Sequence, residues 1–167
     1  MGKKLNAHQS KYGEPIFAAI SVGTILILIG LIFVVTPNLF GAIVEFFKDF
    51  GMVEVDSGTG FVLPAPVSPW KHTTVYQAWA QFSLGIGFLY VVLLALRVNA
   101  NSSIIKTAEM TSNLVFWFGA SYLVSTHLNS NTTHRLWFAF WAGIIALVGV
   151  SFVVRAIILF ARSRSII

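Results

Sequence analysis

Three histidines are the residues of this chain whose chemistry is most versatile. His72, His127 and His134 each stand beside the end of a long apolar stretch. Imidazole is the commonest metal ligand in proteins and also holds haem iron. The sequence therefore raises the hypothesis of a redox protein in which these three histidines converge on a metal ion or a haem.

Acidic residues near these histidines could complete such a site. Glu54 and Asp56 precede His72 in the same segment, and their oxygens would suit zinc, copper or iron beside imidazole. The spacing does not support the hypothesis, because the chain has no His-x-x-x-His pair and no HExxH motif. Histidines at a membrane surface without any ligand role are the alternative. We therefore expect no cofactor, with a metal ion or haem as the other possibility.

Other kinds of chemistry are excluded by what the chain lacks. Without cysteine it has no disulfide, iron–sulfur cluster, thiolate zinc site or cysteine nucleophile. Residues 16–35, 76–96, 110–126 and 137–154, which make up most of its apolar stretches, include no histidine and no charged residue, which disfavours a bis-histidine haem within the bilayer and a proton or ion pump. The sequence thus favours a protein that is not an enzyme.

The histidines must be positioned by four long apolar stretches. These cover residues 16–35, 76–96, 110–127 and 136–160, in a chain of 167 residues that is 56% hydrophobic and 10% charged. About 20 apolar residues in a helix cross the hydrocarbon layer of a bilayer. We predict an all-α integral membrane protein, with residues 1–167 forming one domain built on a four-transmembrane-helix bundle.

The basic residues predict how this bundle is oriented. Of the eleven lysines and arginines, three fall on one side of a four-crossing chain: Lys48, Lys71 and Arg135. The other eight fall on the opposite side: Lys3, Lys4, Lys11, Arg97, Lys106, Arg155, Arg162 and Arg164. Positive residues remain cytoplasmic. We therefore expect a multi-pass protein of the cell membrane with both termini in the cytoplasm and the three histidines outside.

The segment between the first two stretches is the largest piece outside the bilayer. Apolar residues at helical spacing predict an amphipathic helix over 38–51, followed by an outer loop over 52–75 that is rich in proline and glycine. The aromatic residues expected to form its contact surface are Phe40, Phe46, Phe47, Phe50 and Trp70. Such a helix either lies flat on the outer leaflet or docks on a partner subunit.

These observations lead to three functional hypotheses. The first is a non-catalytic accessory or assembly subunit of a larger membrane complex, whose partners are the lipid bilayer and other membrane subunits. The second is the metal- or haem-binding redox protein that uses His72, His127 and His134. The third is a small passive channel or solute carrier. Nucleic acid is not an expected partner, because the basic residues lie at helix ends and form no continuous stripe.

Overall fold

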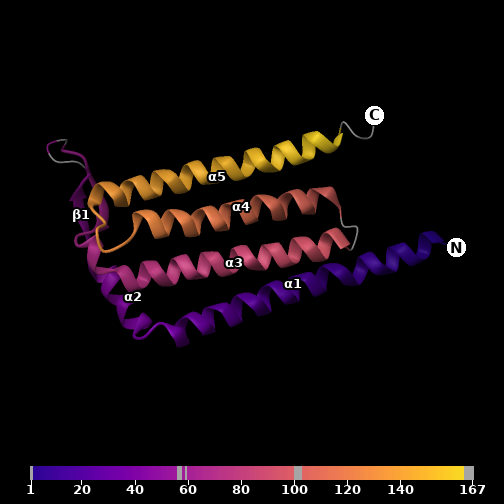
Figure 1. Ribbon diagram of the computed structural model, residues 1–167, viewed down its shortest axis with the longest axis horizontal. Helices are drawn as coiled ribbons and strands as arrows, with labels where there is room; N and C mark the ends of the chain where they lie inside the picture. Colours follow the sequence, from indigo (N-terminus) through magenta and orange to yellow (C-terminus); the bar gives the residue numbers. More distant parts are fainter. Residues whose placement is uncertain (1, 56–57, 59, 100–102, 164–167) are drawn as a thin grey trace.

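Four long helices and a small cap make up the protein. The computed structural model describes residues 2–55, 58, 60–99 and 103–163. The long helices run alongside one another in Figure 1: α1 (Gly2–Val35), α3 (Thr73–Asn99), α4 (Ile104–His127) and α5 (His134–Ser163). The described residues of 36–72 form the cap at one end: α2 (Leu39–Lys48), β1 (Phe50–Glu54), β2 (Val62–Pro66) and the 3-10 helix η1 (Pro69–Lys71). We call the opposite end, where α1 begins and α5 ends, the terminal end.

The prediction of a mostly helical membrane protein is confirmed. Among the described residues, three helices are long and apolar enough to cross a bilayer: Pro15–Val35, Thr73–Asn99 and His134–Ala161. At about 1.5 Å per residue even the shortest of these would extend for about 32 Å, which matches the hydrocarbon layer. α4 lies among these helices but is less apolar than they are.

The lower hydrophobicity of α4 is explained by its contacts with two neighbouring helices. α3 packs along one side of α4 and α5 along the other. Hydroxyl groups bond across both contacts: Ser112 Oγ donates to the Ser151 carbonyl at 2.7 Å, and Ser121 Oγ donates to the Ala80 carbonyl at 2.9 Å. A helix covered on two sides can carry polar side chains, because its neighbours supply the hydrogen-bond partners that lipid cannot.

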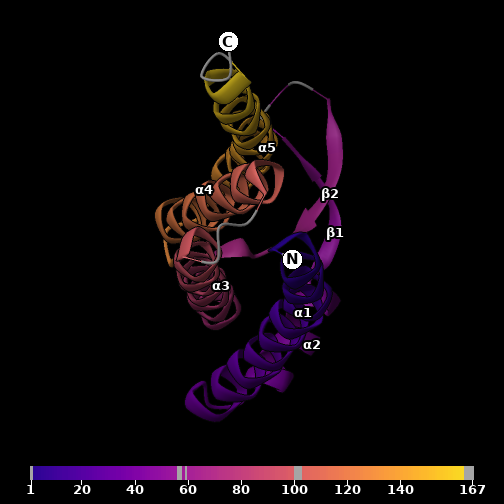
Figure 2. The same cartoon turned by 90° about the vertical axis from the view of Figure 1, so that its right-hand side faces the viewer.

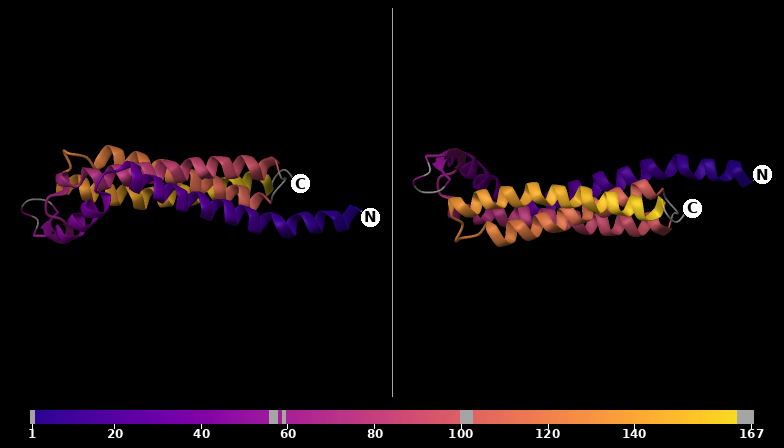
Figure 3. Two further views of the ribbon diagram at one scale, coloured as in Figure 1. Left: turned by 90° about the horizontal axis from the view of Figure 1, so that it is seen from below. Right: turned by 90° about the horizontal axis from the view of Figure 1, so that it is seen from above.

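Within the predicted bundle, the long helices are arranged as a row. Figure 2 shows α3, α4 and α5 in succession with α1 beside α3, and Figure 3 shows α1 at an angle to the other three. In the described part of the chain, α1 packs on α3 and has no comparable contact with α5. Only 6% of the most apolar stretch is buried in each of α1 and α5, against 28% in α3. Lipid is as apolar as a leucine side chain, so nothing drives the row to close.

The cap contains a β-hairpin where the sequence predicted an extended loop in an all-α chain. β1 and β2 pair antiparallel, with Phe50 opposite Pro66 and Glu54 opposite Val62. Prolines are tolerated here because both strands of a two-stranded sheet are edges. The described glycines of the connection, Gly58 and Gly60, have positive φ angles, and their N–H groups donate to Glu54 Oε1 at 3.2 and 2.9 Å. One carboxylate thus closes the turn.

The helix of the cap is shorter than the predicted 38–51. Asn38 adopts a left-handed conformation with φ 54°, which asparagine tolerates better than most residues, and α2 follows from Leu39. α2 ends at Lys48, so Phe50 begins β1 and does not belong to the helix. Asp49, the residue after the helix, contacts Ser68 and His72 elsewhere in the cap.

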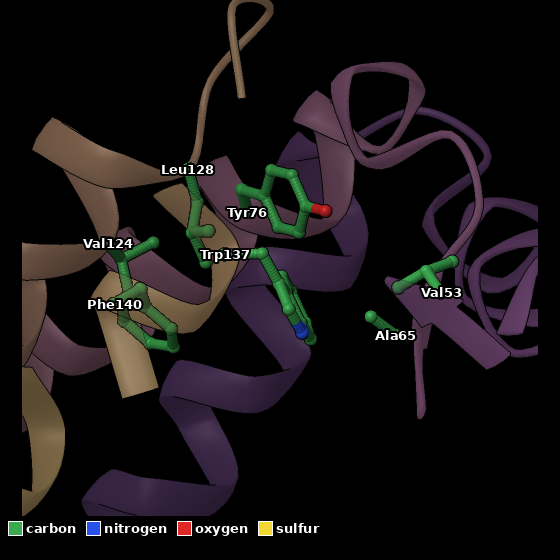
Figure 4. Packing of buried hydrophobic residues seen from close by; sticks show 7 residues of the cluster. All are labelled: Val53, Ala65, Tyr76, Val124, Leu128, Trp137 and Phe140. Carbon is green, nitrogen blue, oxygen red and sulfur yellow. The ribbon is translucent and has the colours of Figure 1, made fainter. Parts of the chain in front are cut away.

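The main apolar core joins the cap to the helices. Figure 4 shows its buried residues, which come from both strands, from three helices and from the residue after α4: Val53, Ala65, Tyr76, Val124, Leu128, Trp137 and Phe140. Trp137 of α5 lies between the hairpin residues on one side and the α4 residues on the other. The core therefore holds the hairpin against the ends of α3, α4 and α5.

Candidate functional site

A short polar contact within the cap joins Asp49 to His72. Asp49 follows the last residue of α2, and His72 precedes the first residue of α3. His72 Nε2 lies 2.8 Å from Asp49 Oδ2, and its side chain is only 8% exposed. The same carboxylate oxygen accepts a hydrogen bond of 2.8 Å from the backbone N–H of Ser68. Asp49 thus connects α2, the segment after β2 and the start of α3.

The charge of Asp49 is stabilised by these contacts. Burial favours the neutral carboxyl group, but the hydrogen bonds from His72 and Ser68 favour the carboxylate and prevail. The pKa of Asp49 is therefore lowered below its ordinary value of 3.8. Because a carboxylate can only accept hydrogen bonds, the imidazole Nε2 is the donor near neutral pH.

Aromatic rings enclose the imidazole of His72. The ring of Phe46 stands edge-on to it with centroids 5.2 Å apart, and Tyr76 lies at 6.5 Å. Trp137 extends the cluster, at 6.1 Å from both Phe46 and Phe50. An imidazole whose Nε2 donates to Asp49 and whose ring is packed in this way anchors the cap. It is not presented to solvent as a general base.

The predicted contact aromatics divide into two groups. Phe46 belongs to the enclosed cluster, and Phe50 contacts the same cluster while 40% of its surface stays exposed. Phe40, Phe47 and Trp70 point outward and are 72%, 68% and 47% exposed. The amphipathic character of α2 therefore reflects two apolar surfaces, one packed inside the cap and one uncovered.

The other two predicted site histidines make separate local contacts. His134, the first residue of α5, donates from Nε2 to the Val67 carbonyl at 3.2 Å. His127, the last residue of α4, places Nδ1 2.9 Å from Thr126 Oγ1 and 3.2 Å from the Leu123 carbonyl. One histidine thus contacts the cap, and the other contacts its own helix.

No metal centre is formed by the residues that the structure describes. Within them, no three His, Asp or Glu side chains come close enough together to hold a metal ion. Glu54 is used in the hairpin turn, and Asp56 lies outside the described residues. The metal or haem hypothesis for His72, His127 and His134 stays a prediction, and the described geometry gives each histidine a different partner.

Sequence reasoning missed Asp49 as a site residue. No motif relates an acid and a histidine 23 positions apart, so the pair could not be recognised from the sequence. The available signal was their position, since each stands at the boundary between a helix and the Pro- and Gly-rich segment. Val67 reinforces the contact: its N–H donates to the Asp49 carbonyl at 2.8 Å, while its own carbonyl accepts from His134.

The chain was compared with models of protein families, with curated proteins and with solved structures, and none of them matches. Inference about function therefore depends on the geometry of this chain alone.

Proposed function

We propose that the protein is a non-catalytic subunit of a larger integral membrane complex, and that its cap binds another membrane protein of that complex. Four helices cross the cell membrane in this proposal, with both termini in the cytoplasm and the cap outside. The Asp49–His72 pair and the aromatic cluster give the cap a fixed shape. The exposed side of the cap makes the contact.

The observation that carries this proposal is the uncovered apolar surface of the cap. Large apolar side chains project from α2, from β1 and its connection to β2, and from η1: Phe40, Phe47, Met52, Phe61 and Trp70, which are 47% to 75% exposed. A helix lying flat on a leaflet would cover the apolar face of α2 alone. Exposed apolar side chains on the hairpin and on η1, in addition to those of α2, favour a protein partner, because exposed apolar patches mark interaction sites.

Several features support α4 as the fourth crossing. α4 runs beside α3 and α5 between the same two ends (Figure 1). Its 24 residues extend for about 36 Å, enough for the hydrocarbon layer. Its buried hydroxyls, at Ser112 and Ser121, bond to neighbouring helices and so avoid lipid. An even number of crossings also agrees with the start of α1 and the end of α5 at the same end of the molecule (Figure 1).

The charge distribution supports the proposed orientation. In the described cap and the adjoining start of α5, the basic residues Lys48, Lys71 and Arg135 are matched by the acids Glu45, Asp49 and Glu54. The terminal end carries Arg97, Lys106 and Arg155 against Glu109. An excess of lysine and arginine marks the cytoplasmic side.

Native mass spectrometry of the protein, extracted in mild detergent from the membrane of its own cell, tests the proposal. We expect a defined stoichiometric assembly that contains other membrane proteins. A lone chain or an assembly of identical chains would overturn the proposal.

Variants of the cap locate the contact. We expect the double variant Met52→Ala/Phe61→Ala to dissociate at least tenfold more readily, because truncating a residue at the energetic centre of an interface costs about 2 kcal/mol or more. Ile145→Ala is the matched control, since Ile145 is 73% exposed on α5 and lies away from the cap. Equal effects of the cap variant and the control would contradict a role for the cap.

Lysine labelling tests the orientation separately. An impermeant amine reagent applied to intact cells should modify Lys71 of the cap and leave Lys3 and Lys4 unmodified until the membrane is opened. Modification of Lys3 or Lys4 on intact cells would reverse the proposed topology without touching the subunit proposal.

A further inference from the structure

A polar cavity lies at the terminal end, far from the cap. Its volume is about 290 Å³, and α1, α3 and α4 all contribute to its wall. Its polar lining residues are Ser21, Tyr90, Arg97, Lys106, Glu109 and Asn113. Charged side chains brought together between membrane helices call for an explanation, because charge is costly to bury in a membrane and tends to mark functional sites.

Arg97 is the central side chain of this cavity. It is only 6% exposed, although it belongs to the last turn of α3. Its guanidinium carbon lies 4.6 Å from the centre of the Phe17 ring of α1, a cation–π contact that fixes the side chain against that helix. An arginine that merely extends from a helix end to water would be largely exposed. Arg97 is instead held in the wall of the cavity.

The cavity lies at the depth of lipid headgroups. Arg97 stands 24 residues after Thr73, the first residue of α3, which corresponds to a rise of about 36 Å. The hydrocarbon layer is about 30 Å thick, so a helix that begins at one interface brings Arg97 to the other. α1 lies at an angle to its neighbours (Figure 3), and the cavity forms where α1 meets α3 and α4.

Among the described residues of the wall, positive charge exceeds negative charge, which favours an anion. Arg97 and Lys106 contribute two positive charges, and Glu109 contributes one negative charge. Tyr90 and Asn113 add uncharged groups that can donate hydrogen bonds. The hydroxyl of Ser21 already donates to the Phe17 carbonyl at 2.8 Å. Arginine beside lysine suits phosphate oxygens, since guanidinium groups bind phosphate in a bidentate manner and lysine binds it as a point charge.

We propose that this cavity binds the phosphate group of an anionic ligand, carried by a membrane lipid or by a soluble molecule. Basic pockets between membrane helices on the cytoplasmic side are typical sites for anionic lipid headgroups. The volume of about 290 Å³ admits a phosphate with a small attached group. The ligand connects α1 to α3 and α4 at the end of the row opposite the cap.

Lipid titration of the purified full-length chain tests this inference. In one arm the delipidated protein in detergent is titrated with phosphatidylglycerol or, for comparison, phosphatidylcholine, and retained lipid is counted by native mass spectrometry. In the other arm inorganic phosphate is titrated by calorimetry against the protein in phosphatidylcholine nanodiscs. Saturable retention of phosphatidylglycerol identifies a lipid source, and saturable binding of phosphate identifies a soluble one. Binding in neither arm overturns the inference.

Three variants show whether the binding occurs in this cavity. Lys106→Gln and Arg97→Gln should each weaken it about fivefold or more, since a basic residue near an anionic headgroup contributes about 1 kcal/mol. Glu109→Gln should strengthen it, because it removes the negative charge of the wall. Arg155→Gln is the control, a charge of α5 that does not line the cavity. Unchanged binding in Lys106→Gln and Glu109→Gln, or an equal loss in Arg155→Gln, overturns the inference even if Arg97→Gln fails to fold.

Discussion

Replacement of Asp49 by alanine should release the cap while leaving the long helices in place. The carboxylate accepts two hydrogen bonds of 2.8 Å, one from His72 Nε2 and one from the Ser68 N–H. Hydrogen bonds to charged groups contribute about 1.5 kcal/mol or more each. The side chain of Asp49 is 24% exposed, so water partly replaces these bonds in the variant. We expect Asp49→Ala to destabilise the closed cap by about 2 kcal/mol.

Hydrogen exchange is the appropriate assay because the change is local. About 2 kcal/mol corresponds to a 30-fold rise in the population of the open cap. Amides that open with the cap should therefore exchange about 30-fold faster. The informative amides are Val55, which donates to the Phe61 carbonyl, and Val67, which donates to the Asp49 carbonyl. Amides in the middle of α4 should keep their wild-type rates.

A double-mutant cycle with His72→Ala isolates the pair itself. If the two side chains act through their mutual contact, the double variant should be less destabilised than the sum of the single variants by about 1 kcal/mol or more. Glu45→Ala is the control, because Glu45 is an exposed acid of α2. Unchanged hairpin exchange in Asp49→Ala, or strict additivity in the cycle, would refute the role assigned to the pair.

Three further predictions concern pH and packing. The pKa of Asp49 is lowered in the folded protein, so the Asp49 carboxylate stabilises the cap at pH values above its ordinary pKa of 3.8. This stabilisation is lost as the pH falls through the folded pKa, and hairpin exchange should therefore accelerate in acid below about pH 4. Asp49→Asn should abolish this acceleration. Tyr76→Phe should leave thermal stability unchanged or raise it by up to about 1 kcal/mol, since the buried Tyr76 hydroxyl has no hydrogen-bond partner within the described residues. Gly119→Val should lower the free energy of unfolding by about 1–3 kcal/mol, because a Cβ at this position would lie 2.5 Å from Leu147 Cδ1. Gly149→Val is the control and should be nearly neutral in thermal unfolding, because a Cβ at Gly149 would meet no atom within 4 Å.

Much of the architecture could be predicted from the sequence because it depends on local composition. Apolar runs without charge predict helices that cross a membrane, and three such helices are found in the described chain. The Pro- and Gly-rich segment after residue 51 predicts an interruption between the first two apolar helices. The absence of cysteine is a property of composition alone and needs no structure.

The cap could not be predicted in the same way. The sequence places prolines at 64 and 66, which reads as a loop, yet both fit on the edge strand β2 once β1 lies beside it. Asp49 and His72 are far apart in sequence, and only the folding of α2 and the hairpin over α3 brings them to 2.8 Å. Whether His72, His127 and His134 converge also depends on tertiary structure, so the sequence could not predict it.

The sequence by itself determined that the chain belongs in a membrane and where its helices and basic residues fall, because hydropathy and charge act over single helices. The tertiary structure alone decided that the helices form a row, that His72, His127 and His134 have separate partners, and that Arg97, Lys106 and Glu109 line one cavity. Lipid covers any apolar face equally well. Which helices meet is therefore set by close packing and specific hydrogen bonds between residues distant in sequence, which no local pattern records.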